Sequence, residues 1–149
     1  MRRYSLKRQK LNRTADEWRR NFRESIGACD ACGDTERLGL HELGLARGTA
    51  NRVKFLMEPC GLLCLCNANP ATGYEGCHEI WDKAEEIDQL ALLYHVRDWC
   101  FDLPRYLFLT REGAPDRITA ADVYKAHRRL TREPRKQATR KSKPFEEFD

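Results

Sequence analysis

The 149-residue sequence has no run of 18 apolar residues, which excludes a transmembrane helix. The basic start, from Met1 to Ser5, is not followed by an apolar stretch, so we expect no signal peptide and a cytoplasmic protein. No segment repeats at a period of about 20–50 residues, which excludes solenoids and propellers. Hydrophobic residues make up only 41% of the chain and aromatic residues 9%, so we expect one domain with a small core.

Charged residues, by contrast, are abundant and unevenly distributed, although the formal net charge is only +4. Residues 1–25 carry 9 Lys and Arg against 3 Asp and Glu, residues 125–149 carry 9 against 4, and the part between them carries 9 against 16. Basic ends favour a polyanionic partner, because each phosphate contact releases counterions. We therefore expect these ends to bind nucleic acid without reading its sequence, chiefly through Arg2, Arg3, Lys7, Arg8 and the cluster at 135–143.

Hydrophobic periodicity and turn residues predict a domain of the α+β class over residues 14–133, between a basic arm at 1–13 and a disordered polar tail at 134–149. Thr14 and Glu17 fit a capping box at the start of the first helix, and Thr119 and Asp122 fit a second one at the start of the last helix. The predicted elements are, in order, a helix at 15–25, strands at 38–43 and 61–66 separated by a long loop, a loop at 67–76, a helix to about 99, and helices at 104–113 and 119–133.

Seven cysteines form the most informative feature of the sequence, because disulfide frameworks are rare in the cytosol and the odd number argues against complete pairing. Cys29 and Cys32 form a Cys-x-x-Cys pair whose thiolates can reach one ion. Zn²⁺ favours a closed tetrahedral site with four such ligands. We expect Cys66, at a strand end, and Cys77, at a helix start, to complete a structural zinc site, although ten residues separate them.

The remaining cysteines need no metal to explain them. Cys64 and Cys100 are interpreted as small buried hydrophobic residues, and Cys60 stays undecided. A redox-active Cys-x-x-Cys of the thioredoxin kind would need a βαβ context, which the predicted element order does not contain.

The sequence resembles an HNH-type nuclease over roughly residues 18–130. That family has a Cys-x-x-Cys pair, a strand ending in a His-His or Asp-His pair, a second strand, and a Cys-x-x-Cys-His motif opening a helix. The corresponding residues here are the Cys29–Cys32 pair, His41-Glu42, Leu63 to Cys66, and Cys77-His78. The similarity is greatest to the phage and planctomycete-type branch, in which the pair reads His-Glu-Ile and an Arg-Gly loop follows, like Ala46-Arg47-Gly48 here.

The resemblance implies a small ββα-metal core with a structural zinc knuckle and helices added at both ends. It implies a metal-dependent endonuclease that hydrolyses phosphodiester bonds in DNA, in a phage-like setting. His41 and His78 would hold a catalytic Mg²⁺ or Mn²⁺, and Glu42 would act as general base or as a third ligand. If Glu42 is a ligand, His41 would be the base. Arg47 and Arg52 would bind phosphate, because the guanidinium fork matches its oxygens.

Three departures from the family pattern keep other interpretations open. Glu42 stands where the family places a histidine, Gly61 stands where it places an asparagine, and the segment 67–76 replaces a tight turn. This segment would either contact substrate or disturb the helix that carries His78. The alternatives are a catalytically inactive zinc-knuckle protein that binds nucleic acid, and a phage assembly protein. His78 could also complete a zinc site of three cysteines and one histidine.

Overall fold

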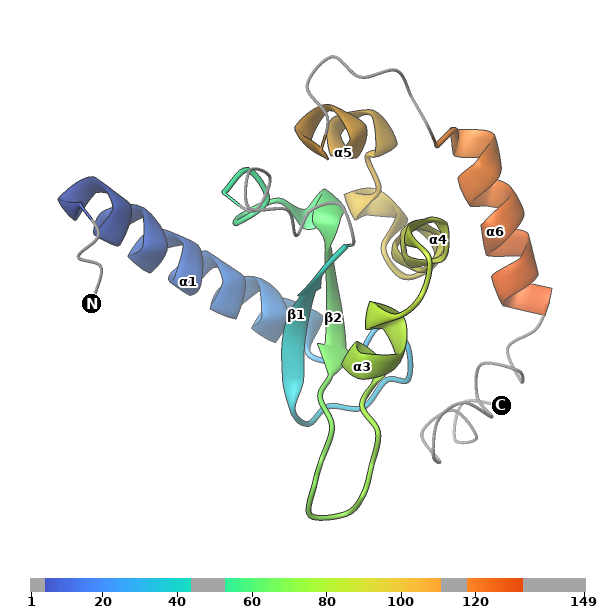
Figure 1. Ribbon diagram of the computed structural model, residues 1–149, viewed down its shortest axis with the longest axis horizontal. Coiled ribbons are helices and arrows are strands. Elements are labelled where there is room, and N and C mark those ends of the chain that lie inside the picture. The colour runs from blue at the N-terminus through green and yellow to red at the C-terminus, as the bar shows by residue number, and fades with distance from the viewer. Residues whose placement is uncertain (1–4, 44–52, 111–117, 133–149) are drawn as a thin grey trace.

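The computed structural model describes residues 5–43, 53–110 and 118–132, and these combine several helices with one two-stranded antiparallel sheet (Figure 1). This mixture agrees with the expected α+β class. The elements are α1 (Leu6–Ile26), β1 (Leu38–Glu42), η2 (Pro59–Gly61), β2 (Leu62–Cys66), α3 (Cys77–Asp82), α4 (Glu86–Val96), η3 (Asp98–Cys100), α5 (Leu103–Thr110) and α6 (Ala120–Arg132).

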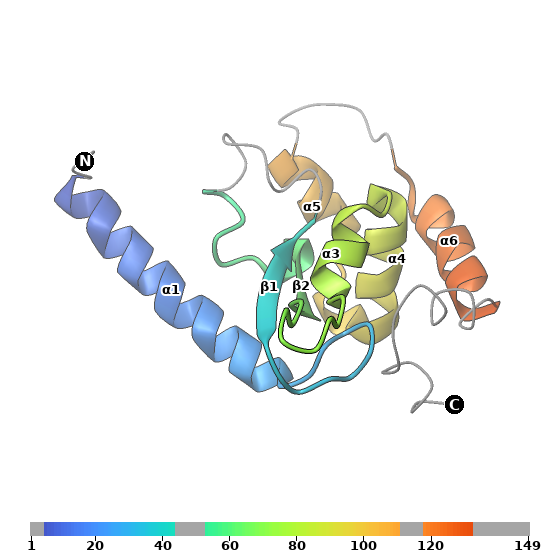
Figure 2. The same ribbon diagram turned by 60° about the horizontal axis from the view of Figure 1, so that its bottom comes forward.

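The sheet lies between helices on its two faces (Figure 2). Strand β1 pairs antiparallel with β2, so that Leu38 lies opposite Cys66 and His41 lies opposite Leu63. All five residues of β2 are buried, as expected for a strand covered on both faces. Helix α1 lies on one side of the sheet, and α3 and α4 lie on the other. The two faces of the sheet therefore meet different partners, which decides the surroundings of neighbouring β1 side chains.

Helix α1 begins earlier than the sequence predicts. The expected start near residue 15 is wrong, because Ser5 is the N-cap and its side chain accepts a hydrogen bond from the backbone N–H of Arg8 at 3.3 Å. Thr14 lies inside the helix, where its hydroxyl donates to the carbonyl of Lys10 at 3.0 Å. Residues 6–13 are mostly good helix formers, so the helix extends through them and across the predicted boundary between arm and domain.

The single helix predicted up to residue 99 is also wrong, since the chain forms α3 and α4 with a break between them. The backbone N–H groups of Lys83 and Ala84 bond three residues back, to Ile80 and Trp81, and thereby end α3. The side chain of Gln89 donates to the carbonyl of Ala84 at 3.0 Å, which stabilises the bend. No glycine or proline marks this position, so the sequence pattern continues across the break.

Two predicted helices near the end of the domain are confirmed as α5 and α6. The capping box that starts α6 is present: the Thr119 hydroxyl accepts from the Asp122 N–H at 3.2 Å, and the Asp122 carboxylate accepts from the Thr119 N–H at 3.0 Å. None of the helices in the described ranges combines the length and the apolar character that crossing a membrane requires.

A buried ion pair holds the sheet to the segment that carries the first two cysteines. The guanidinium of Arg97 lies 2.8 Å from the Asp30 carboxylate and donates to the carbonyl of Leu62 at 2.7 Å. The same carboxylate accepts from the N–H of Cys64 at 2.6 Å. Arg97 also lies over the ring of Phe22, so one guanidinium connects α1, β2, the cysteine segment and the end of α4.

Candidate metal centre and adjoining histidine pair

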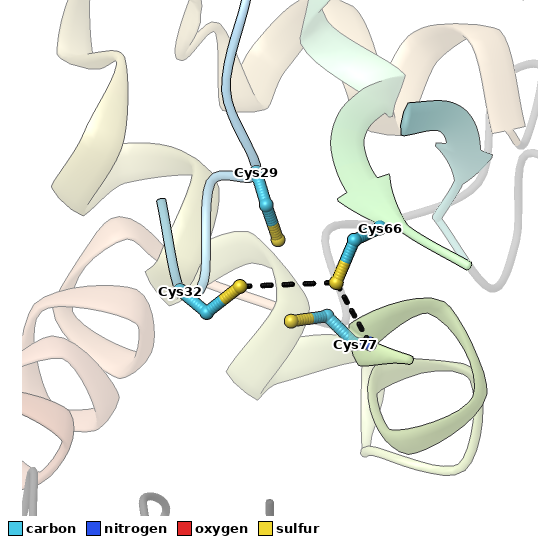
Figure 3. A group of neighbouring side chains, drawn as sticks. All are labelled: Cys29, Cys32, Cys66 and Cys77. Atoms are coloured by element: carbon cyan, nitrogen blue, oxygen red, sulfur yellow. Dashed lines mark hydrogen bonds between the residues drawn. The ribbon is translucent and has the colours of Figure 1, made fainter. Parts of the chain in front are cut away.

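Four buried cysteine side chains converge on one point (Figure 3). Cys29 and Cys32 come from the segment between α1 and β1, Cys66 ends β2, and Cys77 begins α3. Their sulfurs all lie within 4.8 Å of one another, and those of Cys32 and Cys66 are 3.7 Å apart. A tetrahedral zinc with bonds of about 2.3 Å separates its sulfurs by about 3.8 Å. The four residues expected from the sequence therefore lie close enough to hold one metal ion.

Backbone hydrogen bonds explain why the first two cysteines face inward. The N–H of Cys29 donates to the carbonyl of Asp34 at 2.7 Å, and the N–H of Gly33 donates to that of Cys29 at 2.8 Å. Gly33 has a φ of 79°, a left-handed conformation that favours glycine. Two further N–H groups point at sulfur: that of Asp34 donates to Cys32, and that of Cys77 donates to Cys66. Figure 3 shows the second of these bonds. Such donors stabilise the charge of thiolate ligands.

The segment 67–76 covers the sulfur centre instead of displacing it. Its base is closed by a backbone bridge between Asn69 and Tyr74. The hydroxyl of Tyr74 lies 3.5 Å from the sulfur of Cys66 and 3.8 Å from that of Cys32. Burial and these two cysteines raise the pKa of Tyr74, so its hydroxyl keeps its proton and can donate it to sulfur. The insertion thus supplies a hydrogen-bond donor to the centre.

Two groups of cysteines differ in their chemistry. Within the centre, hydrogen bonds with Cys32 and Cys66 and burial raise the pKa of the Cys29 thiol, so an ion that binds here must displace protons. The other three cysteines are buried outside this group. Burial raises the pKa of Cys60 to about 12 and the pKa values of Cys64 and Cys100 to about 11. All three behave as small protonated hydrophobic residues, in agreement with the interpretation of Cys64 and Cys100.

The structure brings His41 and His78 together beside the sulfur centre. Their ring centroids are 5.0 Å apart, and the rings meet edge to face at 80°. His41 is fully buried on β1, whereas His78 follows Cys77 in α3 and is half-buried. Nε2 of His41 lies 2.8 Å from Oε1 of Gln89, and Nδ1 of His78 lies 2.9 Å from Oδ1 of Asn67. Each ring is thus held by one side-chain amide.

The third residue of the expected catalytic set lies elsewhere. The carboxylate of Glu42 lies 3.6 Å from the guanidinium of Arg19 on α1. Neighbouring residues of a strand point to opposite faces, so His41 faces α3 and α4 while Glu42 faces α1. His78 makes no part of the sulfur centre, which has four cysteines without it. Arg47 and Arg52 lie outside the described residues, as do Arg2, Arg3 and the basic cluster at 135–143.

Sequence reasoning did not assign roles to the two amides or to the buried ion pair. Gln89 is 2% exposed within the apolar run of α4, and a polar residue in such a run is the signal that points to it. Asn67 directly follows Cys66, as His78 directly follows Cys77. The position of the Asn67 amide therefore depends on that of Cys66, and the position of the His78 ring depends on that of Cys77.

No protein-family model matches the chain, and neither a curated protein nor a solved structure matches it. Within the described ranges, the four cysteines are the only set of three or more metal-ligating side chains that gathers around one point. The histidine pair supplies two imidazoles beside it.

Proposed function

We propose that this protein is a metal-dependent endonuclease of the HNH type, which hydrolyses phosphodiester bonds in DNA. The observation that supports the proposal is the meeting of His41, from the end of one strand, with His78, from the start of a helix, directly beside four converging sulfurs. In this proposal β1, β2 and α3 form the ββα-metal core. The four cysteines hold a structural Zn²⁺, which joins the end of β2, the start of α3 and the segment before β1.

His41 and His78 would hold the second ion. A bound divalent ion supplies a Lewis acid for the phosphate and lowers the pKa of a water molecule. Imidazole nitrogens favour first-row transition ions over Mg²⁺, so the donor set makes Mn²⁺ a better occupant than Mg²⁺. Because His78 is half-buried and His41 is fully buried, substrate would approach from the side of His78. Glu42 faces α1, so it would take no part in the reaction at the phosphate.

The DNA backbone would be held by basic side chains of α1 and α6. The first turns of α1 extend away from the rest of the described chain in both views (Figures 1 and 2). They carry exposed Lys7, Lys10 and Arg13, with no acidic residue between residues 6 and 13. Helix α6 carries Lys125, Arg128, Arg129 and Arg132. Cations of this kind bind phosphates without selecting a base sequence.

A second candidate function is favoured by a separate observation. His41 has no exposed surface and Glu42 is engaged with Arg19, which suits a non-enzymatic zinc-knuckle protein that binds nucleic acid. Such a protein would use the same sulfur centre and the same basic helices. It would bind DNA in a salt-sensitive way and would not cut it.

A plasmid-relaxation assay separates the two functions. Purified protein with its zinc content verified is incubated with Mg²⁺, Mn²⁺ or EDTA, beside His78→Ala and the control His95→Ala. His95 lies on α4 next to His127, outside the site. Cleavage that needs the added ion, persists in H95A and disappears in zinc-loaded H78A supports the nuclease. Folded wild-type protein that retards DNA on a gel but does not cut it with any ion refutes the nuclease and favours the binding protein.

A further inference from the structure

We infer that Gln89 and Asn67 are positioning residues that fix opposite tautomers of His41 and His78, so that His41 presents the Nδ1 lone pair and His78 presents the Nε2 lone pair. The chemical purpose of this arrangement rests on the proposed nuclease function. The tautomers themselves follow from hydrogen bonds between described residues.

The amide of Gln89 has only one chemically sensible orientation. Its nitrogen lies 3.0 Å from the carbonyl oxygen of Ala84, and a carbonyl oxygen can only accept a hydrogen bond. The nitrogen must therefore face Ala84, which turns Oε1 toward His41 at 2.8 Å. Because Oε1 is also an acceptor, Nε2 of His41 carries the proton. The neutral ring then has its lone pair on Nδ1.

The amide of Asn67 gives the opposite result by the same reasoning. Its nitrogen lies 3.1 Å from the carbonyl oxygen of Arg37, which also accepts the backbone N–H of Asn67 at 2.8 Å. Oδ1 therefore faces Nδ1 of His78 at 2.9 Å, and this nitrogen carries the proton. The lone pair of His78 is on Nε2. The two rings thus carry their lone pairs on different nitrogens, Nδ1 in His41 and Nε2 in His78.

The backbone around each amide leaves room for it and holds it in place. A Cβ atom on Gly39 would lie 2.9 Å from the amide nitrogen of Asn67, so a side chain at Gly39 would push this amide out of place. Gln89 uses the carbonyl that the break between α3 and α4 makes available. Both amides are therefore built into the fold, which is what a positioning role requires.

Metal-binding histidines almost always donate their second ring N–H to an acceptor that fixes the ring and its tautomer. Carboxylates and backbone carbonyls are the usual acceptors, and here two amide oxygens take that place. The asparagine that the HNH pattern would place at Gly61 is absent, and a Cβ there would lie 2.3 Å from the Phe55 ring. Orientation of the histidines comes instead from Gln89 and Asn67.

The wild-type protein tests the inference directly. Long-range ¹H–¹⁵N spectra of zinc-loaded protein at pH 8, with His41 and His78 assigned by substitution, report which ring nitrogen carries the proton. We expect Nε2–H at His41 and Nδ1–H at His78. The opposite tautomer, or a rapidly averaged one, at either residue would overturn the inference. This readout needs neither a second ion nor DNA.

Variants of Gln89 test whether the amide is the cause. Gln89→Met keeps the volume and removes the acceptor, so the His41 tautomers should mix and Mn²⁺ affinity, measured by electron paramagnetic resonance, should fall about 10- to 100-fold. Gln89→Glu keeps the acceptor and should keep the tautomer. Thr110→Val, which removes a buried hydrogen bond to Tyr106 in α5, is the control for general destabilisation and should leave His41 unchanged.

The outcomes separate this inference from the proposed function. Q89M protein with an unchanged His41 tautomer and unchanged Mn²⁺ affinity would overturn the positioning role. Wild-type protein with the expected tautomers that neither binds Mn²⁺ nor cuts DNA would refute the nuclease and still support the positioning role. If Q89M does not fold, the wild-type spectrum decides.

Discussion

The sulfur centre and the histidine pair lie side by side in the fold and differ in how many ligands they provide. The centre gathers four sulfurs and so closes a tetrahedral site. The pair gathers two imidazoles, and each ring has a hydrogen bond with a side-chain amide. A closed set of ligands suits a structural ion, whereas a set of two leaves positions for water and substrate. In the proposed nuclease, ligand number distinguishes the two sites more than residue type does.

Loss of the sulfur centre should have the largest effect on the stability of the fold. Structural zinc contributes about 10–16 kcal/mol in small domains, which is comparable to the whole stability of a domain, about 5–15 kcal/mol. Cys66→Ser, or removal of zinc with a strong chelator, should therefore unfold the protein, as followed by circular dichroism. The control Cys60→Ser alters a buried thiol outside the centre and should remain folded. A chelated protein that keeps its helical spectrum would contradict the structural role of the ion.

The ion pair behind the centre comes next. Breaking a buried pair costs about 3–5 kcal/mol, because the remaining charge is left without its partner. Arg97→Met should lower the free energy of unfolding by about that amount in urea titrations. Since Arg97 contacts Asp30, Leu62 and Phe22 but neither histidine, Mn²⁺ affinity of the folded variant should stay unchanged. A parallel loss of Mn²⁺ affinity would show that the two sites are not separate units.

Tyr74 tests the outer contacts of the sulfur centre. Tyr74→Phe removes the hydroxyl near Cys66 and Cys32 while the ring stays over the centre. Zinc affinity, measured by competition with a chelator, should fall about 10-fold, the lower end of the range for outer-shell partners. Arg37→Gln, which removes the cation over the same ring, is the matched control and should have less effect. Equal affinities of Y74F and wild type would assign the hydroxyl no role at the metal.

Glu42 tests the histidine pair from the other face of β1. Glu42→Gln weakens the pair with Arg19, which is partly exposed, so the free energy of unfolding should change by no more than about 1 kcal/mol. Cleavage rates should change less than about threefold, since this carboxylate faces α1. A loss of activity as large as that of H78A would show that Glu42 acts together with the histidine pair. The two faces of β1 would then not be functionally separate.

The smallest effect is expected at a second pair of histidines, to which no side-chain amide among the described residues is bonded. Nδ1 of His95 and Nε2 of His127 are 3.0 Å apart between α4 and α6. Burial, and then the charge of His95, lower the pKa of His127. The neutral ring therefore favours the folded state above the unfolded pKa of about 6.5, and this contribution is lost as pH falls through the lowered value.

The measurement is a pH series of unfolding curves for wild type and His127→Gln. The destabilisation of wild-type protein below about pH 6 should be smaller in the variant. Identical pH profiles would show that this pair does not couple α6 to protonation.

The parts of the structure that sequence could predict are those with local signals. The Cys-x-x-Cys spacing pointed to Cys29 and Cys32, and the predicted strand end and helix start pointed to Cys66 and Cys77. The four sulfurs do converge. The capping box at Thr119 also marked its helix correctly. Such signals act within a few residues and do not depend on the rest of the fold.

The errors in the helix boundaries and at Glu42 have different causes. The break after α3 depends on Gln89 reaching back to Ala84 and on its contact with His41, and no local pattern encodes it. Helix α1 begins after Ser5 instead of at Thr14, because residues 6–13 are mostly good helix formers. The position of Glu42 was within reach of sequence reasoning, since neighbours in a strand cannot face the same site.

The arrangement of the segment 67–76 makes its tip a place where the chain can vary. Both ends are anchored, at Cys66 and at Cys77, and the Asn69–Tyr74 bridge isolates the turn between them. Residues 70–73 are exposed, and a Cβ on Gly73 would meet no atom within 4 Å. An epitope tag or a small guest domain inserted there would leave His78 and the sulfurs where they are. The tip is thus an insertion-tolerant site, at which the chain can be lengthened without a change in the rest of the fold.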